Sequence, residues 1–260
     1  MYKIKSLEFR RFSADHHNAS RNWLIPIIKT NDPNIFGIGD SSALGDDDRI
    51  IDESKFLFDK YLIDKNPLDT EALWLEMYNN SMQRGGRIST TAISGIDIAL
   101  WDIKGKALSQ PIYRLLGGAL REKLMVYANG WYSNPGTPEE NFKEAKKVIK
   151  MGYKALKFDP FGQKNFYRLS KEEFSLSEQR ISSVRKSVGE NVEILIEGHA
   201  KFNLMNAIKI SDMIKKYNPL FFEEPVSEER IEELVQLKKI PIYQLQQEKD
   251  FILNFHLQKL

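Results

Sequence analysis

Apolar and polar positions divide the chain into two regions with different rhythms. The first region opens with two apolar stretches, residues 3–12 and 23–30, which we expect to be strands joined by a polar loop at residues 15–21. A turn signal at residues 31–34 precedes a third short strand at residues 35–39. The beginning of the chain is therefore predicted to be a small sheet.

Three helices are expected to follow this sheet. The acidic residues 46–48 lie at the start of the first helix, where the helix dipole favours negative charge, and Asp69 can cap the second. The third helix is predicted over residues 91–108, because five apolar residues recur there at spacings of three and four. These residues are Ala92, Ile96, Ala99, Ile103 and Ala107. The first region is thus an α+β arrangement.

From about residue 124 onward, short apolar strands alternate with amphipathic helices. The strands are expected at residues 125–128, 153–158, 192–196, 220–222 and 240–242. Such β/α alternation predicts a parallel sheet, either doubly wound or closed into a barrel, and periodicity alone does not choose between them. About four and a half units are present, whereas a complete barrel has eight.

The tail at residues 243–260 lacks the turn punctuation of the preceding units, and the β/α rhythm stops there. We expect this tail to be atypical and offer a reading-frame shift near Ile242 as the hypothesis. A partial barrel exposes strand edges and apolar helix faces, so low solubility or oligomerisation is predicted for the chain by itself.

Composition narrows the classes of function. The absence of cysteine excludes disulfides, thiolate catalysis and zinc–thiolate sites. Lysine and arginine are interspersed with acidic residues at a formal net charge of +2, so no basic block suggests nucleic-acid binding. No apolar run is long enough for a membrane span or a signal peptide. We therefore expect a cytoplasmic protein with no nucleic-acid or membrane partner.

Ionisable residues follow three successive predicted strands. They are Lys157 and Asp159 at the end of the second strand, Glu197 and His199 at the end of the third, and Glu223 and Glu224 at the end of the fourth. In a β/α barrel these strand ends meet on one rim, which is where active sites lie. Carboxylates there can bind a hard cation such as Mg²⁺, which stabilises charge as a C–H proton leaves, and a histidine can transfer a proton near neutral pH. Loss of a β-hydroxyl then completes the dehydration of a hydroxy acid.

The third predicted helix carries a distinctive run, AISGIDIALWDIKGKA at residues 92–107, which is followed by PIYRLLGG at residues 111–118. Together they resemble the signature of the mandelate racemase/muconate lactonizing enzyme group of the enolase superfamily. The resemblance extends from about residue 1 to 242. It implies an N-terminal α+β capping domain at residues 1–118 and the first half of a modified (β/α)₇β barrel at residues 119–242.

The resemblance also implies a metal site with Mg²⁺ as the cofactor. Glu197 matches the first ligand position, where aspartate is usual, and Glu223 matches the second as the first residue of a Glu-Glu-Pro motif. The third ligand is normally the glutamate of a Gly-Glu pair, but Gln246 stands at that place. A neutral amide is a poorer Mg²⁺ ligand than a carboxylate.

Two further matches concern the catalytic residues. Lys157 matches the first lysine of a Lys-x-Lys pair that racemase-like members carry, whereas Asp159 replaces the second, which normally acts as a base. The pair formed by Glu197 and His199 resembles the mannonate and galactonate dehydratase branch. It implies that His199 is the general acid that protonates the departing hydroxyl and that Lys157 contacts the substrate carboxylate. For Asp159, a catalytic and a structural role both stay open.

The function implied by the resemblance is Mg²⁺-dependent dehydration of a small-molecule sugar acid, an aldonate or aldarate, to a 2-keto-3-deoxy acid. Two alternatives are a racemase or epimerase of a hydroxy acid and a catalytically inactive truncated paralogue. A histidine on the seventh strand, which serves as the base in many members, would lie beyond residue 260. A homo-oligomer is expected for a full-length form.

Overall fold

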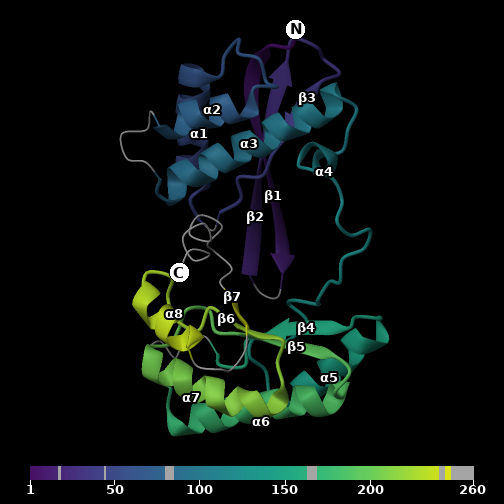
Figure 1. Cartoon of the computed structure of the whole chain (residues 1–260), viewed down its shortest axis with the longest axis vertical. Coiled ribbons are helices and arrows are strands. Elements are labelled where there is room, and N and C mark those ends of the chain that lie inside the picture. The colour runs from purple at the N-terminus through teal and green to yellow at the C-terminus, as the bar shows by residue number, and fades with distance from the viewer. Residues whose placement is uncertain (17–18, 44, 80–84, 163–168, 240–243, 247–260) are drawn as a thin grey trace. The chain divides into compact units, whose positions relative to one another are not determined.

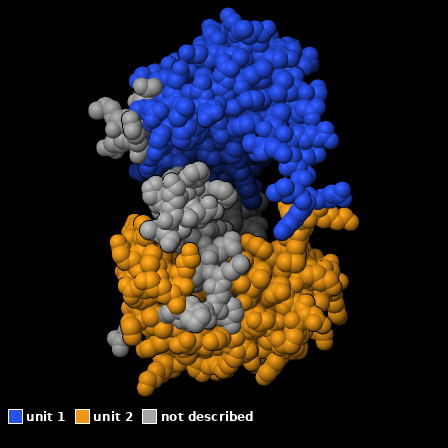
Figure 2. Space-filling model, in the orientation of Figure 1, with its two compact units in different colours: residues 1–122 blue, residues 123–260 orange. Residues whose placement is uncertain are grey.

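The computed structural model describes residues 1–16, 19–43, 45–79, 85–162, 169–239 and 244–246. These residues form two compact units, Met1–Glu122 and Lys123–Leu260, drawn in different colours in Figure 2. Each unit has a hydrophobic core of its own. Within the described residues, no helix is both long enough and apolar enough to cross a membrane.

The first unit is a three-stranded antiparallel sheet with four helices (Figure 1). Its strands are β1 (Ile4–His16), β2 (Ala19–Thr30) and β3 (Phe36–Ile38). Its helices are α1 (Asp47–Tyr61), α2 (Thr70–Asn79), α3 (Arg87–Ala107) and α4 (Ile112–Leu115). The predicted α+β arrangement is confirmed. Helix α3 begins a turn earlier than predicted, at Arg87, and Ile88 in this added turn also packs against the core.

The apolar face of α3 forms the centre of the first core. Ile96, Ala99 and Ile103 are fully buried there, as their spacing predicts. Strand β3 runs so close to this helix that a Cβ atom on Gly37 would lie 1.9 Å from the carbonyl oxygen of Ala99. Only glycine allows the strand and the helix to approach this closely.

One expectation about the first unit is wrong. Residues 15–21 are not a loop: β1 and β2 continue as an antiparallel hairpin in which Asp15 lies opposite Ser20 and His16 opposite Ala19. The backbone hydrogen bonds of a hairpin need no apolar side chains, so a polar sequence did not reveal these ends of the strands. Residues 17–18 lie outside the described part.

The second unit is a parallel sheet with strand order β4-β5-β6-β7. Its strands are β4 (Ala155–Phe158), β5 (Glu193–Glu197), β6 (Phe221–Glu223) and β7 (Gln244–Gln246). Its helices are α5 (Pro138–Lys150), α6 (Lys171–Val188), α7 (Leu204–Ile214), the short 3₁₀ helix η1 (Lys215–Tyr217) and α8 (Ile231–Lys238). The predicted β/α alternation is confirmed, and the described strands form part of a barrel that does not close.

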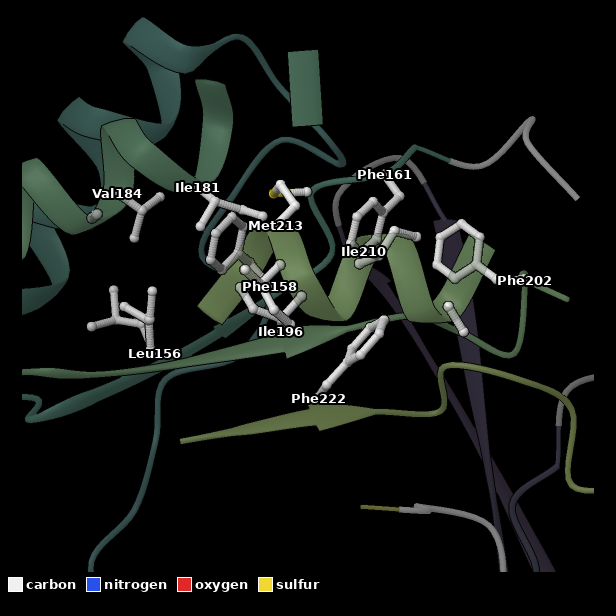
Figure 3. Packing of buried hydrophobic residues seen from close by; sticks show 14 of the residues in the cluster. Leu156, Phe158, Phe161, Ile181, Val184, Ile196, Phe202, Ile210, Met213 and Phe222 are labelled. Carbon is white, nitrogen blue, oxygen red and sulfur yellow. The ribbon is translucent and has the colours of Figure 1, made fainter. Parts of the chain in front are cut away.

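Polar side chains fix where the three longer helices of this unit begin. Thr137, Ser170 and Asn203 each accept a hydrogen bond from the backbone N–H three positions further on, at the starts of α5, α6 and α7. These helices lie along one face of the sheet (Figure 1). In Figure 3 the strand residues Leu156, Phe158, Ile196 and Phe222 lie among side chains of α6 and α7. That face of the sheet is therefore the hydrophobic core.

The strand predicted at residues 125–128 is not formed. Only Ala128 pairs with the sheet, through a bridge to Leu156, while Leu124, Met125 and Val126 are mostly exposed. Apolar composition alone does not make a strand, because a strand also needs a partner along its length. The last predicted strand, at residues 240–242, lies outside the described residues. Of the tail at residues 243–260, the structure describes only residues 244–246, which form β7.

Candidate active site

The face of the second sheet opposite the helices changes from apolar to charged along the strands. Ala155, Leu195 and Phe221 form a small apolar cluster on this face. Side chains alternate between the two faces of a strand, so the residues two positions further on point the same way. These residues are Lys157, Glu197 and Glu223, and all three are almost completely buried. The carboxyl ends of β4, β5 and β6, called the rim below, thus bring three charges together.

Lys157 lies between the two glutamates. Its Nζ atom is 3.0 Å from Oε2 of Glu197 and 2.8 Å from Oε2 of Glu223. Glu197 and Glu223 lie opposite each other in the β5–β6 register, which explains why their carboxylates converge. Burial opposes the charged form of the lysine, but the bonds to both carboxylates outweigh it and raise the pKa of Lys157 above its ordinary value. The residue is therefore a cation at neutral pH.

Asp159 is the centre of a second group on the rim. Its buried carboxylate accepts a hydrogen bond from the backbone N–H of Phe161 at 2.9 Å and contacts Nδ1 of His199 at 2.7 Å. Lys201 donates to the same carboxylate and is itself buried. Sequence reasoning missed Lys201. The available signal was indirect: a buried aspartate needs a cation, and Lys201 follows Glu197 by four residues in the same segment.

His199 is held in one orientation at the end of β5. Its backbone has a positive φ of 48°, and its backbone N–H donates to Oε1 of Glu197 at 2.8 Å. The side chain is 45% exposed. The bond to Asp159 is the main cause that raises the pKa of His199 above its ordinary value. Because Asp159 occupies Nδ1, Nε2 is the nitrogen through which this ring would act on a ligand.

Gly198 allows this geometry. The backbone after β5 passes directly along the end of β6, where the N–H of Gly198 donates to the carbonyl of Glu223 at 2.8 Å. A Cβ atom at this position would lie 2.6 Å from the carbonyl oxygen of Glu224 and 3.0 Å from that of Glu223. Any larger residue would push the ends of β5 and β6 apart and, with them, the two glutamates.

Aromatic residues from the segment before α5 also lie at the site, and sequence reasoning missed them. The indole N–H of Trp131 donates to the carbonyl of Lys157 at 2.8 Å, and the Tyr127 ring lies 5.6 Å from Nζ of Lys157. The hydrogen bond from Trp131 therefore fixes the backbone of Lys157 from outside the sheet. The neighbouring Tyr132 is buried, and this burial raises the pKa of its phenol to about 12.

The register of β7 places Gln246 beside Glu223, the position at which a third ligand was expected. In the part of the chain that the structure describes, no three His, Asp or Glu side chains form a group that could hold a metal ion. The two glutamates nevertheless converge on a single cation, the Lys157 ammonium. Proteins often bind Mg²⁺ through one or two carboxylates with substrate and water oxygens. By donor chemistry, Glu197 and Glu223 therefore fit Mg²⁺.

Comparison with known proteins places the chain and its fold in a family. Residues 18–117 match the mandelate racemase/muconate lactonizing enzyme N-terminal domain, and residues 141–250 match the enolase C-terminal domain-like family. The solved structure of a member of the enolase superfamily from Salmonella Typhimurium is similar with a TM-score of 0.86 and 30% identity, over 96% of this chain and 68% of that chain. The chain belongs to the mandelate racemase/muconate lactonizing enzyme group of the enolase superfamily.

Curated relatives within this superfamily are sugar-acid dehydratases. D-gluconate dehydratase of Thermoproteus tenax is 43% identical over 65% of this chain and 34% of its own length. D-gluconate/D-galactonate dehydratase of Picrophilus torridus is 38% identical over 69% of this chain and 46% of its own length. D-galactonate dehydratase of Pectobacterium atrosepticum is 31% identical over 81% of this chain and 53% of its own length. This enolase-superfamily chain thus spans about a third to a half of these relatives.

Proposed function

We propose that the rim carries part of the active site of a Mg²⁺-dependent sugar-acid dehydratase. The reaction converts an aldonate or aldarate to a 2-keto-3-deoxy acid by removal of the α-proton and loss of the β-hydroxyl. The single observation that carries this proposal is the convergence of Glu197 and Glu223 around one cation, next to a half-exposed histidine. The names of the relatives favour D-gluconate or D-galactonate as the substrate.

Glu197 and Glu223 would hold Mg²⁺, which would supply positive charge to the substrate carboxylate as the α-proton leaves. Lys157 is a cation in the same layer, so it can bind that carboxylate when a substrate is present. These three residues bind and orient the acid end of the substrate. Removal of the α-proton is not among the roles assigned to them.

His199 is the proposed general acid. In its protonated form the ring donates a proton from Nε2 to the departing β-hydroxyl, which leaves as water. Asp159 holds the opposite nitrogen, and Lys201 balances the charge of Asp159. Asp159 and Lys201 are therefore proposed as positioning residues that keep the ring turned toward the substrate. Their burial supports this role, because a buried hydrogen-bonded group has few alternative orientations.

An assay of the full chain with a panel of sugar acids and Mg²⁺ tests the proposal. We expect a 2-keto-3-deoxy acid from D-gluconate or D-galactonate and none from the Glu223→Gln variant. Proton NMR in D₂O separates the alternatives: a racemase or epimerase exchanges the α-proton but keeps the β-hydroxyl. Absence of a keto-deoxy product from every acid in the panel would refute the proposal.

A further inference from the structure

The Lys157 ammonium occupies the place between Glu197 and Glu223 that a bound cation would need. Its Nζ atom is within 3.0 Å of an oxygen of each carboxylate, and the three side chains are at most 3% exposed. The backbone of Lys157 is fixed by hydrogen bonds, through its N–H to Ala128 and through its carbonyl to Trp131. Another cation could therefore reach the two glutamates only if the side chain of Lys157 moves while its backbone stays in place.

The Lys157 ammonium and a metal ion would compete for the same carboxylate oxygens. Mg²⁺ requires oxygen ligands at about 2.0–2.1 Å, so it would approach the same oxygens that the ammonium contacts. Two cations that share these oxygens repel each other strongly in a buried site. The neighbouring register position, Gln246, adds no negative charge that would offset this repulsion.

We propose that Lys157 is an internal counter-ion that competes with divalent cations for Glu197 and Glu223, so that metal and a carboxylate ligand bind this site cooperatively. The inference deepens the proposed function and rests on it for the identity of the acid. When a metal ion takes the two glutamates, the ammonium loses its partners. A carboxylate ligand supplies a new one.

The physical basis of the cooperativity is the flexible four-carbon stem of lysine, which allows its compact charge to change partners. The ring of Tyr127 already lies 5.6 Å from Nζ, so the ammonium has one favourable contact that does not depend on the two carboxylates. Linkage then requires the effect to be reciprocal. The acid raises the affinity for the metal by the same factor by which the metal raises the affinity for the acid. Without the lysine charge, both the competition and this coupling disappear.

Binding of Mn²⁺ to the full chain, followed by electron paramagnetic resonance of the free ion, tests the inference. We expect Lys157→Gln and Lys157→Met to bind Mn²⁺ about tenfold or more tightly than the unmodified chain, because they remove the competing charge. The matched control is Lys154→Gln, an exposed lysine just before the same strand. Its affinity should stay within about twofold of the unmodified chain, as for most surface charges.

The coupling is measured with 3-deoxy-D-gluconate, which has a carboxylate but no β-hydroxyl to lose. This acid should tighten Mn²⁺ binding to the unmodified chain and to Lys154→Gln. It should have little effect on the two Lys157 variants. Equal coupling in all four proteins would overturn the cooperative part of the inference.

Thermal melts with and without Mn²⁺ serve as the control for folding of the variants. The Lys157 variants leave two buried carboxylates without their cation, so they should melt at a lower temperature without Mn²⁺ and regain stability when it is added. The double variant Lys157→Gln/Glu223→Gln removes one of these charges; it should fold without Mn²⁺ and fail to bind it. If the Lys157 variants bind Mn²⁺ no more tightly than the unmodified chain and gain no stability from it, the inference is wrong.

The dehydration assay separates the two proposals. Tighter Mn²⁺ binding by the Lys157 variants, in a chain that dehydrates no sugar acid, would support the counter-ion and refute the dehydratase. Dehydration by the unmodified chain, with unchanged Mn²⁺ affinity in the Lys157 variants, would support the dehydratase and refute the counter-ion.

Discussion

At the scale of single residues, the contact between His199 and Asp159 makes stability depend on pH. The contact raises the pKa of the imidazole, so the folded chain favours the protonated ring. This stabilisation is complete below the unfolded pKa of about 6.5 and is lost as the pH rises through the higher folded pKa. We expect His199→Gln to lower the free energy of unfolding, measured in urea, more at low pH than at high pH. An equal loss of unfolding free energy at low and at high pH would show that the contact between His199 and Asp159 does not cause the pH dependence.

Gly198 is the second residue whose substitution has a defined consequence. In Gly198→Ala, the new methyl group would meet the carbonyl oxygen of Glu224 at 2.6 Å, well inside van der Waals contact. We expect a loss of about 1–3 kcal/mol in the free energy of unfolding, as for other overpacked sites. Mn²⁺ affinity should also fall, because Glu197 and Glu223 move apart. Unchanged affinity and an unchanged melt would show that the loop accommodates the methyl group.

Three of the charged residues that meet on the rim could be predicted from the sequence, but not every residue that contacts the site. Lys157, Glu197 and Glu223 were found because each lies at the carboxyl end of a buried strand, and the strand ends of a parallel sheet meet on one rim. Lys201 and Trp131 were missed. Their roles depend on which segments cross the rim after folding, and no local spacing encodes that crossing. The same limit applies to the contacts of Asp159 with His199 and Lys201.

At the scale of elements, Arg185 joins α6 to two connections of the second sheet. Its guanidinium donates to four carbonyls, those of Gly189 and Val192 before β5 and those of Tyr217 and Asn218 before β6. We expect Arg185→Met to cost about 2–4 kcal/mol in the free energy of unfolding, because buried carbonyls lose their donors. The exposed neighbour Lys186 provides the control: Lys186→Met should change that free energy by less than about 0.5 kcal/mol. Similar losses in both variants would refute the assigned role.

Elements with a strong apolar period were predicted well, and those without one were not. Helix α3 follows from the spacing of its buried residues, since this helix faces a core. The strand expected at residues 125–128 was wrong, although its composition suits a strand. Pairing requires a neighbour, and beyond Ala128 the described part of the sheet offers this segment none. The ends of the β1–β2 hairpin were missed for the opposite reason, because pairing there does not depend on apolar residues.

At the scale of the whole molecule, each of the two units has a hydrophobic core of its own. The first unit centres on α3, and the second on the layer between its sheet and helices α5, α6 and α7. Both units match family descriptions separately. The charged rim lies entirely within the second unit. Its geometry therefore follows from three adjacent strands and the loops after them.

An incompletely paired edge strand gives the last prediction. Strand β4 is paired with β5 on one side, and in the described residues its other side is bridged only by Ala128. Next to this edge, Leu124, Met125 and Val126 are 76%, 68% and 64% exposed. Open edges and adjacent apolar patches promote association between chains. We expect the chain to self-associate with rising concentration in sedimentation velocity.

Two substitutions test whether this edge is the cause. The double variant Met125→Lys/Val126→Glu places charges beside β4, and we expect it to shift the chain toward the monomer. The control Met151→Lys/Met205→Lys removes two methionines of comparable exposure that lie elsewhere in the second unit. This control should associate as the unmodified chain does, because neither methionine adjoins an open strand. A chain that stays monomeric at every concentration, or a control that dissociates as fully as the edge variant, would rule out association through β4.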